Sequence, residues 1–188
     1  MAIITITKVI EGPTITSTDP ASIRCREHQL ICIDSEGYIE QVVDESDADF
    51  STVKQHAADN DTLVQLKTDE YLLPGFIDLH VHAPQWPNAG VALDQPLNEW
   101  LDTYTFPLEA KYQDTAFAKR VYDDLVAELI GNGTTTALYF GTTHNPANSE
   151  LAMACITHHQ RGFIGKVAMD NPDPVSYTHL RAHETDQY

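Results

Sequence analysis

Cysteine and basic side chains are both scarce in this sequence of 188 residues. The three cysteines (Cys25, Cys32 and Cys155) lie far apart and form no C-x-x-C pair, which argues against a disulfide framework and favours reduced thiols. Lysine and arginine total 11 against 28 aspartates and glutamates, and this acidic surface repels nucleic-acid phosphates and anionic lipid. No apolar run approaches the roughly 20 residues that span a bilayer, and the N-terminus lacks the basic-then-apolar order of a signal peptide. We therefore expect a cytoplasmic protein that binds neither nucleic acid nor a membrane.

The first part of the chain, residues 1–70, has the pattern of β-strands. Segments 30–33 and 38–43 are rich in β-branched residues, and they flank an Asp-Ser-Glu-Gly turn, which predicts a hairpin. Residues 44–61 are acidic and polar, which indicates a loop with a short helix. Residues 64–66 fit one more short strand.

From residue 71 onward the pattern changes to strands alternating with helices. Asp114 suits an N-cap, and apolar residues recur every fourth position after it until Gly131-Asn132-Gly133 ends the helix. Asn148 is the predicted cap of a later helix, and Gly162 is its predicted end. Together the predicted elements are strands at 71–82, 134–140 and 163–170 and helices at about 97–104, 115–131 and 149–161. This alternation is typical of parallel βαβ units with right-handed crossovers.

Residues 74–82, Pro-Gly-Phe-Ile-Asp-Leu-His-Val-His, carry the strongest chemical signal. Side chains alternate along a strand, so Asp78, His80 and His82 share one face. Two imidazoles at the end of one strand can hold a divalent metal, and imidazole is a common zinc ligand. The alternative is a strand whose two histidines are satisfied by water or by backbone groups.

The stretch P-G-F-I-D-x-H-x-H resembles the first barrel strand of the metal-dependent amidohydrolase superfamily. Four further stretches are similar to the guanine deaminase family in particular: H-A-P-Q at 82–85, L-x-x-W-L-x-x-Y-T-F-P at 97–107, N-G-T-T-T-A-x-Y-F at 132–140 and G-K-V-x-M-D at 165–170. The resemblance covers roughly residues 1–173. Residues 174–188 depart from it and are similar to a translated sequencing adapter, so we expect a foreign, unstructured tail there.

The resemblance implies an α/β fold in which a small β-sandwich segment (1–70) precedes the first three strand–helix units of a partial (β/α)8 TIM-like barrel (71–173). It also implies a zinc-dependent enzyme with one Zn²⁺ per site that hydrolyses guanine to xanthine and ammonia, and full-length relatives that are homodimers. A complete barrel needs about 250 residues. The family takes a third histidine, an acid/base glutamate and an aspartate ligand from later strands, so no catalytic acid or base is expected within this chain, which would be inactive alone. The alternatives are another superfamily aminohydrolase of purines, pyrimidines or triazines, or a non-catalytic fragment that at most binds a metal weakly.

The resemblance assigns zinc ligation to His80 and His82, and substrate contacts to His82, Ala83, Pro84, Gln85 and Trp100. The amide of Gln85 suits a purine edge because it offers both a donor and acceptors, although an ordinary loop glutamine is the alternative. Trp100, Tyr104 and Phe106 fit either a stacking wall or core packing.

Other polar residues receive weaker predictions. Asp78 is expected to support the site rather than to bind metal. His144 is either a supporting residue or a surface histidine, His158 and His159 are expected to be structural, and Lys166 is not expected to bridge two metals.

Overall fold

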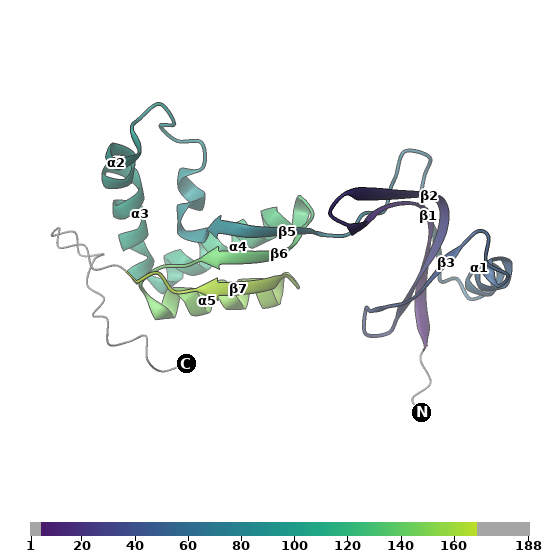
Figure 1. Ribbon diagram of the computed structural model, residues 1–188. Coiled ribbons are helices and arrows are strands. Elements are labelled where there is room, and N and C mark those ends of the chain that lie inside the picture. The colour runs from purple at the N-terminus through teal and green to yellow at the C-terminus, as the bar shows by residue number, and fades with distance from the viewer. Residues whose placement is uncertain (1–4, 169–188) are drawn as a thin grey trace. The chain divides into compact units, whose positions relative to one another are not determined.

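The computed structural model describes residues 5–168 and divides the chain between Pro74 and Gly75 into two units (Figure 1). Each unit has its own buried apolar cluster. Among the described residues, no helix is both long enough and apolar enough to cross a membrane. The predicted tail at 174–188 lies outside the described residues.

The first unit is a four-stranded sheet in the order β3-β2-β1-β4 with one helix beside it. Its elements are β1 (Ile6–Asp19), β2 (Ser22–Asp34), β3 (Ile39–Asp44), α1 (Phe50–Asp59) and β4 (Leu63–Gln65). The predicted hairpin is confirmed as β2 and β3, and Gly37 in its turn has a φ of 89°, which L-residues with side chains rarely adopt. Strand β4 joins β1 in parallel. Within residues 5–168 this unit has one sheet, so the sandwich stays a prediction.

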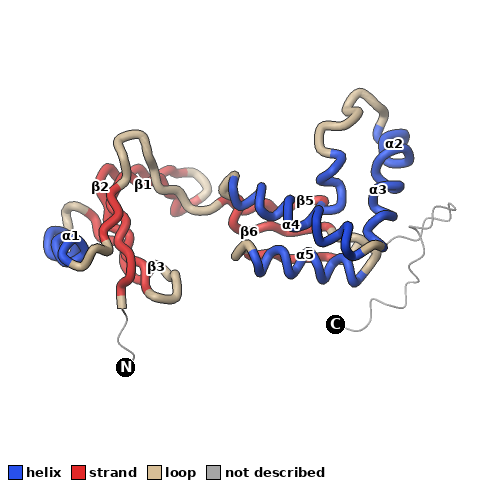
Figure 2. Tube along the Cα trace, turned by 180° about the vertical axis from the view of Figure 1, so that it is seen from behind, coloured by secondary structure: helices blue, strands red, loops and turns tan. Residues whose placement is uncertain are grey.

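The second unit is a parallel three-stranded sheet in the order β5-β6-β7, with α4 and α5 across one face (Figure 2). The elements are β5 (Phe76–His82), α2 (Leu97–Trp100), α3 (Phe106–Ala110), α4 (Thr115–Gly131), β6 (Thr134–Phe140), α5 (Asn145–Thr157) and β7 (Arg161–Gly165). The core under the helices includes Val126, Ala137, Tyr139 and Leu151. The α/β character and the parallel strand order agree with the sequence prediction.

Helix α4 begins and ends where the sequence predicts. The Asp114 carboxylate accepts a hydrogen bond from the Ala116 N–H at 2.9 Å, so it caps the helix. After Gly131 the chain leaves the helix through Gly133, whose φ is 90°. Side chains at Phe117 and Leu125 pack into the core, as the four-residue period predicts.

The first predicted strand of this unit is too long at its start. Strand β5 begins at Phe76 rather than at residue 71. The preceding segment pairs with the first sheet instead, because the Leu72 carbonyl accepts from the Ile15 N–H at 3.0 Å. Gly75 then passes so close to Thr135 that a Cβ at this position would collide with the threonine side chain.

Both predicted ends of helix α5 are wrong. The helix begins at Asn145, with Pro146 in its first turn, and Asn148 lies inside it. It ends at Thr157, whereas Gly162 lies within β7, where a Cβ would come within 2.7 Å of the Cys155 sulfur. The predicted strand 163–170 is likewise shifted, since β7 begins at Arg161 and ends at Gly165.

Candidate metal centre

His80 and His82 lie side by side at the C-terminal end of β5. Their Nε2 atoms are 3.1 Å apart, and their ring centroids are 5.0 Å apart. Asp78 lies further back on the strand, where its Oδ1 accepts a hydrogen bond from the His80 N–H at 3.0 Å. The alternation of the strand therefore brings both imidazoles to one face, while Val81 packs on the opposite side into the core.

An aromatic ring from the neighbouring strand supports this histidine pair. The ring of Phe140, the last residue of β6, stacks on the His82 ring at 4.7 Å with an interplanar angle of 9°. It also contacts the His80 ring at 4.9 Å. Partial burial, and then the neighbouring His80, lower the pKa of His82 below its ordinary value of 6.5. The His82 ring therefore favours the neutral form that binds metals.

The spacing of the two nitrogens fits a shared zinc ion. Two imidazole nitrogens about 2.0–2.1 Å from a tetrahedral zinc are about 3.3 Å apart, close to the 3.1 Å between the two Nε2 atoms. The same distance fits a hydrogen bond between the rings when one Nε2 carries the proton. Within residues 5–168, no group of three or more histidine, cysteine or acidic side chains gathers around one point. The described residues thus offer two ligands, and a zinc site needs at least one more.

A groove of about 400 Å³ runs beside the histidine pair. Its lining includes His80, His82, Gln85 and Trp100, four of the residues that the resemblance assigns to metal or substrate. The Trp100 indole is held by a hydrogen bond from its Nε1 to the Val91 carbonyl at 2.8 Å.

Ala83 and Pro84 occupy a different position from the groove residues. Both side chains are buried and do not line the groove, and the Pro84 carbonyl accepts a hydrogen bond from the Tyr112 hydroxyl at 2.9 Å. They begin the 3-10 turn at Ala83–Asn88 that carries Gln85. Their place fits a contact through the backbone or an indirect role.

Hydrogen bonds from Asn148, a residue within α5, hold the loop that follows β6. The Asn148 Oδ1 accepts from the Thr142 N–H at 2.8 Å, and the Asn148 Nδ2 donates to the Thr142 carbonyl at 2.9 Å. The loop places His144 at the start of α5, near Lys166, which follows β7. Burial and then Lys166 lower the pKa of His144 below 6.5. Directly after α5, the His158 Nε2 lies 2.8 Å from the Asp123 Oδ1 of α4, which agrees with the predicted structural role.

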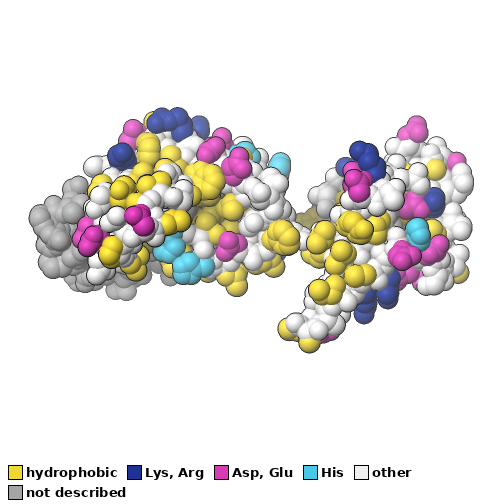
Figure 3. Space-filling model, turned by 90° about the horizontal axis from the view of Figure 1, so that it is seen from above, with side chains coloured by type: hydrophobic (Ala, Val, Ile, Leu, Met, Phe, Trp, Pro, Cys, Tyr) yellow, Lys and Arg dark blue, Asp and Glu magenta, His cyan; other side chains and the backbone are white. Residues whose placement is uncertain are grey.

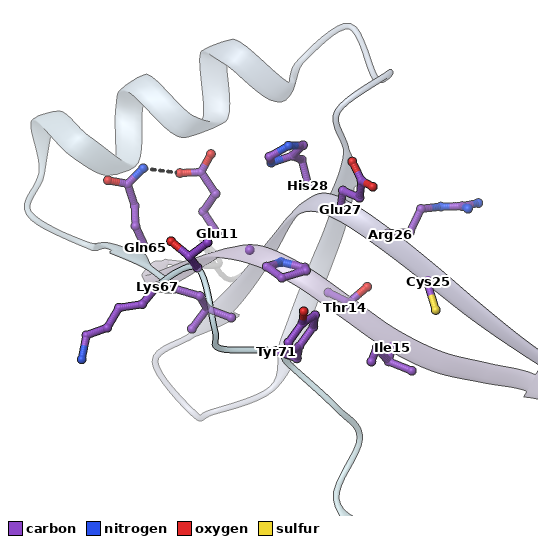
Figure 4. A pocket seen from close by; sticks show the side chains of 14 residues that line it. Glu11, Thr14, Ile15, Cys25, Arg26, Glu27, His28, Gln65, Lys67 and Tyr71 are labelled. Atoms are coloured by element: carbon purple, nitrogen blue, oxygen red, sulfur yellow. Dashed lines mark hydrogen bonds between the residues drawn. The ribbon is translucent and has the colours of Figure 1, made fainter.

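A larger pocket, of about 650 Å³, lies in the first unit (Figure 4). Its lining includes Glu11, which accepts hydrogen bonds at 2.6 Å from both Lys54 and Gln65. Burial alone would raise the pKa of Glu11, but these hydrogen bonds outweigh it and lower the pKa. Because the carboxylate is already engaged within the protein, this pocket is a weaker candidate site than the histidine pair.

The comparison with known families identifies the second unit. The sequence model of the amidohydrolase family matches residues 71–187, more than half of the chain. The chain belongs to the amidohydrolase family. The matched range includes the residues for which the sequence predicts a foreign tail.

The amidohydrolases most informative for this chain are guanine deaminases. The chain is 36% identical to guanine deaminase of Dictyostelium discoideum over 180 residues, which cover 92% of the chain and 40% of that protein. It is 47% identical to human guanine deaminase over 111 residues, which cover 58% of the chain and 24% of that protein. The crystal structure of guanine deaminase from C. acetobutylicum with bound guanine superposes with a TM-score of 0.78 at 30% identity, over 92% of the chain and 39% of that structure. This amidohydrolase chain therefore spans about 40% of the length of these two relatives.

Sequence reasoning missed two side chains at the site. The sequence marks Phe140 only as part of a motif, although its ring contacts both imidazoles. The sequence patterns do not point to Glu109, although it is buried and its Oε1 accepts a hydrogen bond from the Gln85 Nε2 at 3.2 Å. The sequence offers little signal for Glu109, because it lies on α3, between the predicted helices at 97–104 and 115–131.

Proposed function

We propose that this chain supplies the first zinc ligands and the purine-reading side chains of a guanine deaminase. His80 and His82 hold the zinc, and Gln85 with Trp100 contacts guanine, with His82, Ala83 and Pro84 beside it. The observation that carries the proposal is the pair of Nε2 atoms 3.1 Å apart, beside a groove that holds Gln85 and Trp100. The similarity to guanine deaminases over most of the chain supports the same reaction.

In this proposal the described residues prepare the site for hydrolysis. Zinc supplies a hydroxide at neutral pH when bound. The lowered pKa of His82 keeps its ring neutral and available for ligation. Phe140 restricts the rotation of both imidazoles, and Asp78 ties down the backbone that carries His80. Gln85 and Trp100 hold the base at the groove, and the acid/base residues come from later strands.

The proposal extends to the rest of the fold. The three parallel strands are the first strands of a (β/α)8 barrel, preceded by part of a β-sandwich. Apolar side chains are exposed on the second unit (Figure 3), which fits this interpretation. Ile77, Leu79 and Phe163 are exposed, and a complete barrel would cover them. We further propose a homodimeric, cytoplasmic enzyme.

The decisive experiment uses the protein encoded by the complete reading frame. Guanine is the test substrate, loss of its ultraviolet absorbance with appearance of xanthine is the readout, and adenine and a triazine are the comparison substrates. We expect guanine turnover and about one zinc per active site. Turnover of a triazine or pyrimidine without guanine would favour another aminohydrolase, and turnover of none would favour a non-catalytic fragment.

Zinc content tests the ligand assignment separately from turnover. The double variant His80→Ala/His82→Ala should lose bound zinc, whereas His56→Ala, an exposed histidine on α1, should retain it. Zinc retained in the double variant at the unsubstituted level would exclude these two histidines as ligands.

A further inference from the structure

Glu109 is a carboxylate in an unusual place. It lies on α3 with 6% of its surface exposed, next to the buried Leu108. Burial first, and then the Glu109 charge, raise the phenol pKa of Tyr112. The pKa of Tyr122 is raised by burial, then by Tyr112 and last by Glu109. A buried carboxylate is costly unless its oxygens accept hydrogen bonds. The position of Glu109 therefore calls for a specific partner.

The amide of Gln85 provides that partner. Its Nε2 donates to the Glu109 Oε1 at 3.2 Å. An ionised carboxylate only accepts hydrogen bonds, so the amide nitrogen has to face Glu109. The Gln85 Oε1 then points away from Glu109. Gln85 lines the groove beside His80, whereas Glu109 is not among the residues that line it.

We propose that Glu109 is a positioning residue, which holds the NH₂ end of Gln85 so that the Gln85 carbonyl oxygen accepts a hydrogen bond from an N–H of the purine. The inference rests on the proposed function, because it specifies how Gln85 reads the base. A free glutamine amide can turn either end to a ligand, whereas one anchored on a carboxylate keeps its carbonyl oxygen turned away from that carboxylate. The site then selects a base with an N–H donor at this position and disfavours a base with a ring acceptor there.

A reciprocal exchange of the two side chains tests this arrangement. Gln85→Glu places two carboxylates together and should lower kcat/KM for guanine about tenfold or more. Adding Glu109→Gln removes the repulsion, restores the hydrogen bond in the opposite direction and keeps an acceptor oxygen toward the groove. The double variant should therefore recover most of the lost kcat/KM.

A matched control and a second variant separate positioning from general stability. Gln85→Glu combined with Glu128→Gln changes the net charge equally but alters an exposed side chain of α4, and it should not recover. Glu109→Leu frees the Gln85 amide, so it should raise KM for guanine about tenfold while kcat changes less and zinc content stays constant. Equal recovery in both double variants, no recovery in either, or an unchanged KM in Glu109→Leu would overturn the inference.

Thermal unfolding of the same variants keeps the inference distinct from the proposed function. If the protein deaminates no guanine, the proposed function fails. The melting temperatures of the two single variants and the double variant then still test the contact between Gln85 and Glu109. Non-additive melting shifts for Gln85→Glu and Glu109→Gln support the positioning contact, whereas additive shifts contradict it.

Discussion

Replacing Asn148 by alanine should lower the free energy of unfolding by about 2–4 kcal/mol. The Asn148 side chain makes two hydrogen bonds with the backbone of Thr142, at 2.8 Å to the N–H and at 2.9 Å to the carbonyl. Thr142 is fully buried, with 0% of its surface exposed. The truncation therefore leaves a donor and an acceptor without partners away from water, at about 1–3 kcal/mol each, and partial relaxation of the loop reduces the sum.

This magnitude distinguishes the two interpretations of Asn148. A lost helix cap, which the sequence predicts, costs only about 1 kcal/mol. The assay is urea denaturation of the protein, followed by circular dichroism, with the m-value compared to show that the unfolded state is unchanged. Asn145→Ala is the matched control, because Asn145 is an exposed first residue of the same helix and its loss should change stability by no more than about 0.5 kcal/mol.

Hydrogen exchange adds a local readout. In Asn148→Ala the amide of Thr142 should exchange at least about tenfold faster, since 1.4 kcal/mol corresponds to a factor of ten. A loss of stability below 1 kcal/mol together with unchanged exchange at Thr142 would refute the reasoning.

Three further predictions concern buried hydroxyl groups, a close backbone contact and a partly buried histidine. Tyr112→Phe should lower the free energy of unfolding by about 1–2 kcal/mol, because the Tyr112 hydroxyl donates to a buried carbonyl. Tyr122→Phe should be neutral or stabilising, because the buried Tyr122 hydroxyl has no partner among the described residues. Chemical denaturation of the two variants compares these effects. Gly75→Ala should lower the free energy of unfolding by about 1–3 kcal/mol, because the new Cβ collides with Thr135. Adding Thr135→Ala to the same chain should recover part of that stability in thermal melting. An equal loss of stability in the single and the double variant would contradict the collision. The pKa of His144 is lowered below 6.5 in the folded protein, so the unfolded state binds more protons just below that pH. The free energy of unfolding should therefore fall as the pH drops through 6.5, and His144→Gln should flatten this part of the stability profile. Parallel profiles of the two proteins would argue against a role of His144 in this pH dependence.

The strand and helix that carry strong local patterns were predictable from the sequence. Asp114 and the four-residue apolar period locate α4, and the β-branched run before Phe140 locates β6 to the residue. The i, i+2 spacing of His80 and His82 also predicts their shared face, because side-chain alternation is a local property of a strand.

The errors arise where tertiary contacts overrule local preference. Leu72 follows the first sheet although its sequence continues into β5, because pairing with Ile15 satisfies its backbone. Asn148 resembles a helix cap, but its amide finds both partners on Thr142. Gly162 is required for close packing on Cys155, and a contact between residues on different elements leaves no local sequence signal.

The shared face of His80 and His82 was predictable from the sequence, but the side chains that contact the candidate site from other elements were not. Gln85 stood out through its motif, whereas its anchor Glu109 lies 24 residues away along the chain. Phe140 reaches the imidazoles only because β5 and β6 are neighbours in the sheet, with His82 opposite Phe140 in the pairing. Such partners depend on topology, which a single sequence does not encode at any fixed spacing.

In the proposed metal site, the stack of Phe140 on His82 would link metal binding to the correct alignment of β6 with β5. A slip of β6 by one residue along β5 would turn its aromatic ring to the helix side and leave the imidazole free to rotate. Molecules with this shifted strand pairing would then bind a metal ion with lower affinity. Metal uptake during refolding would thus report that these two strands have found their native alignment.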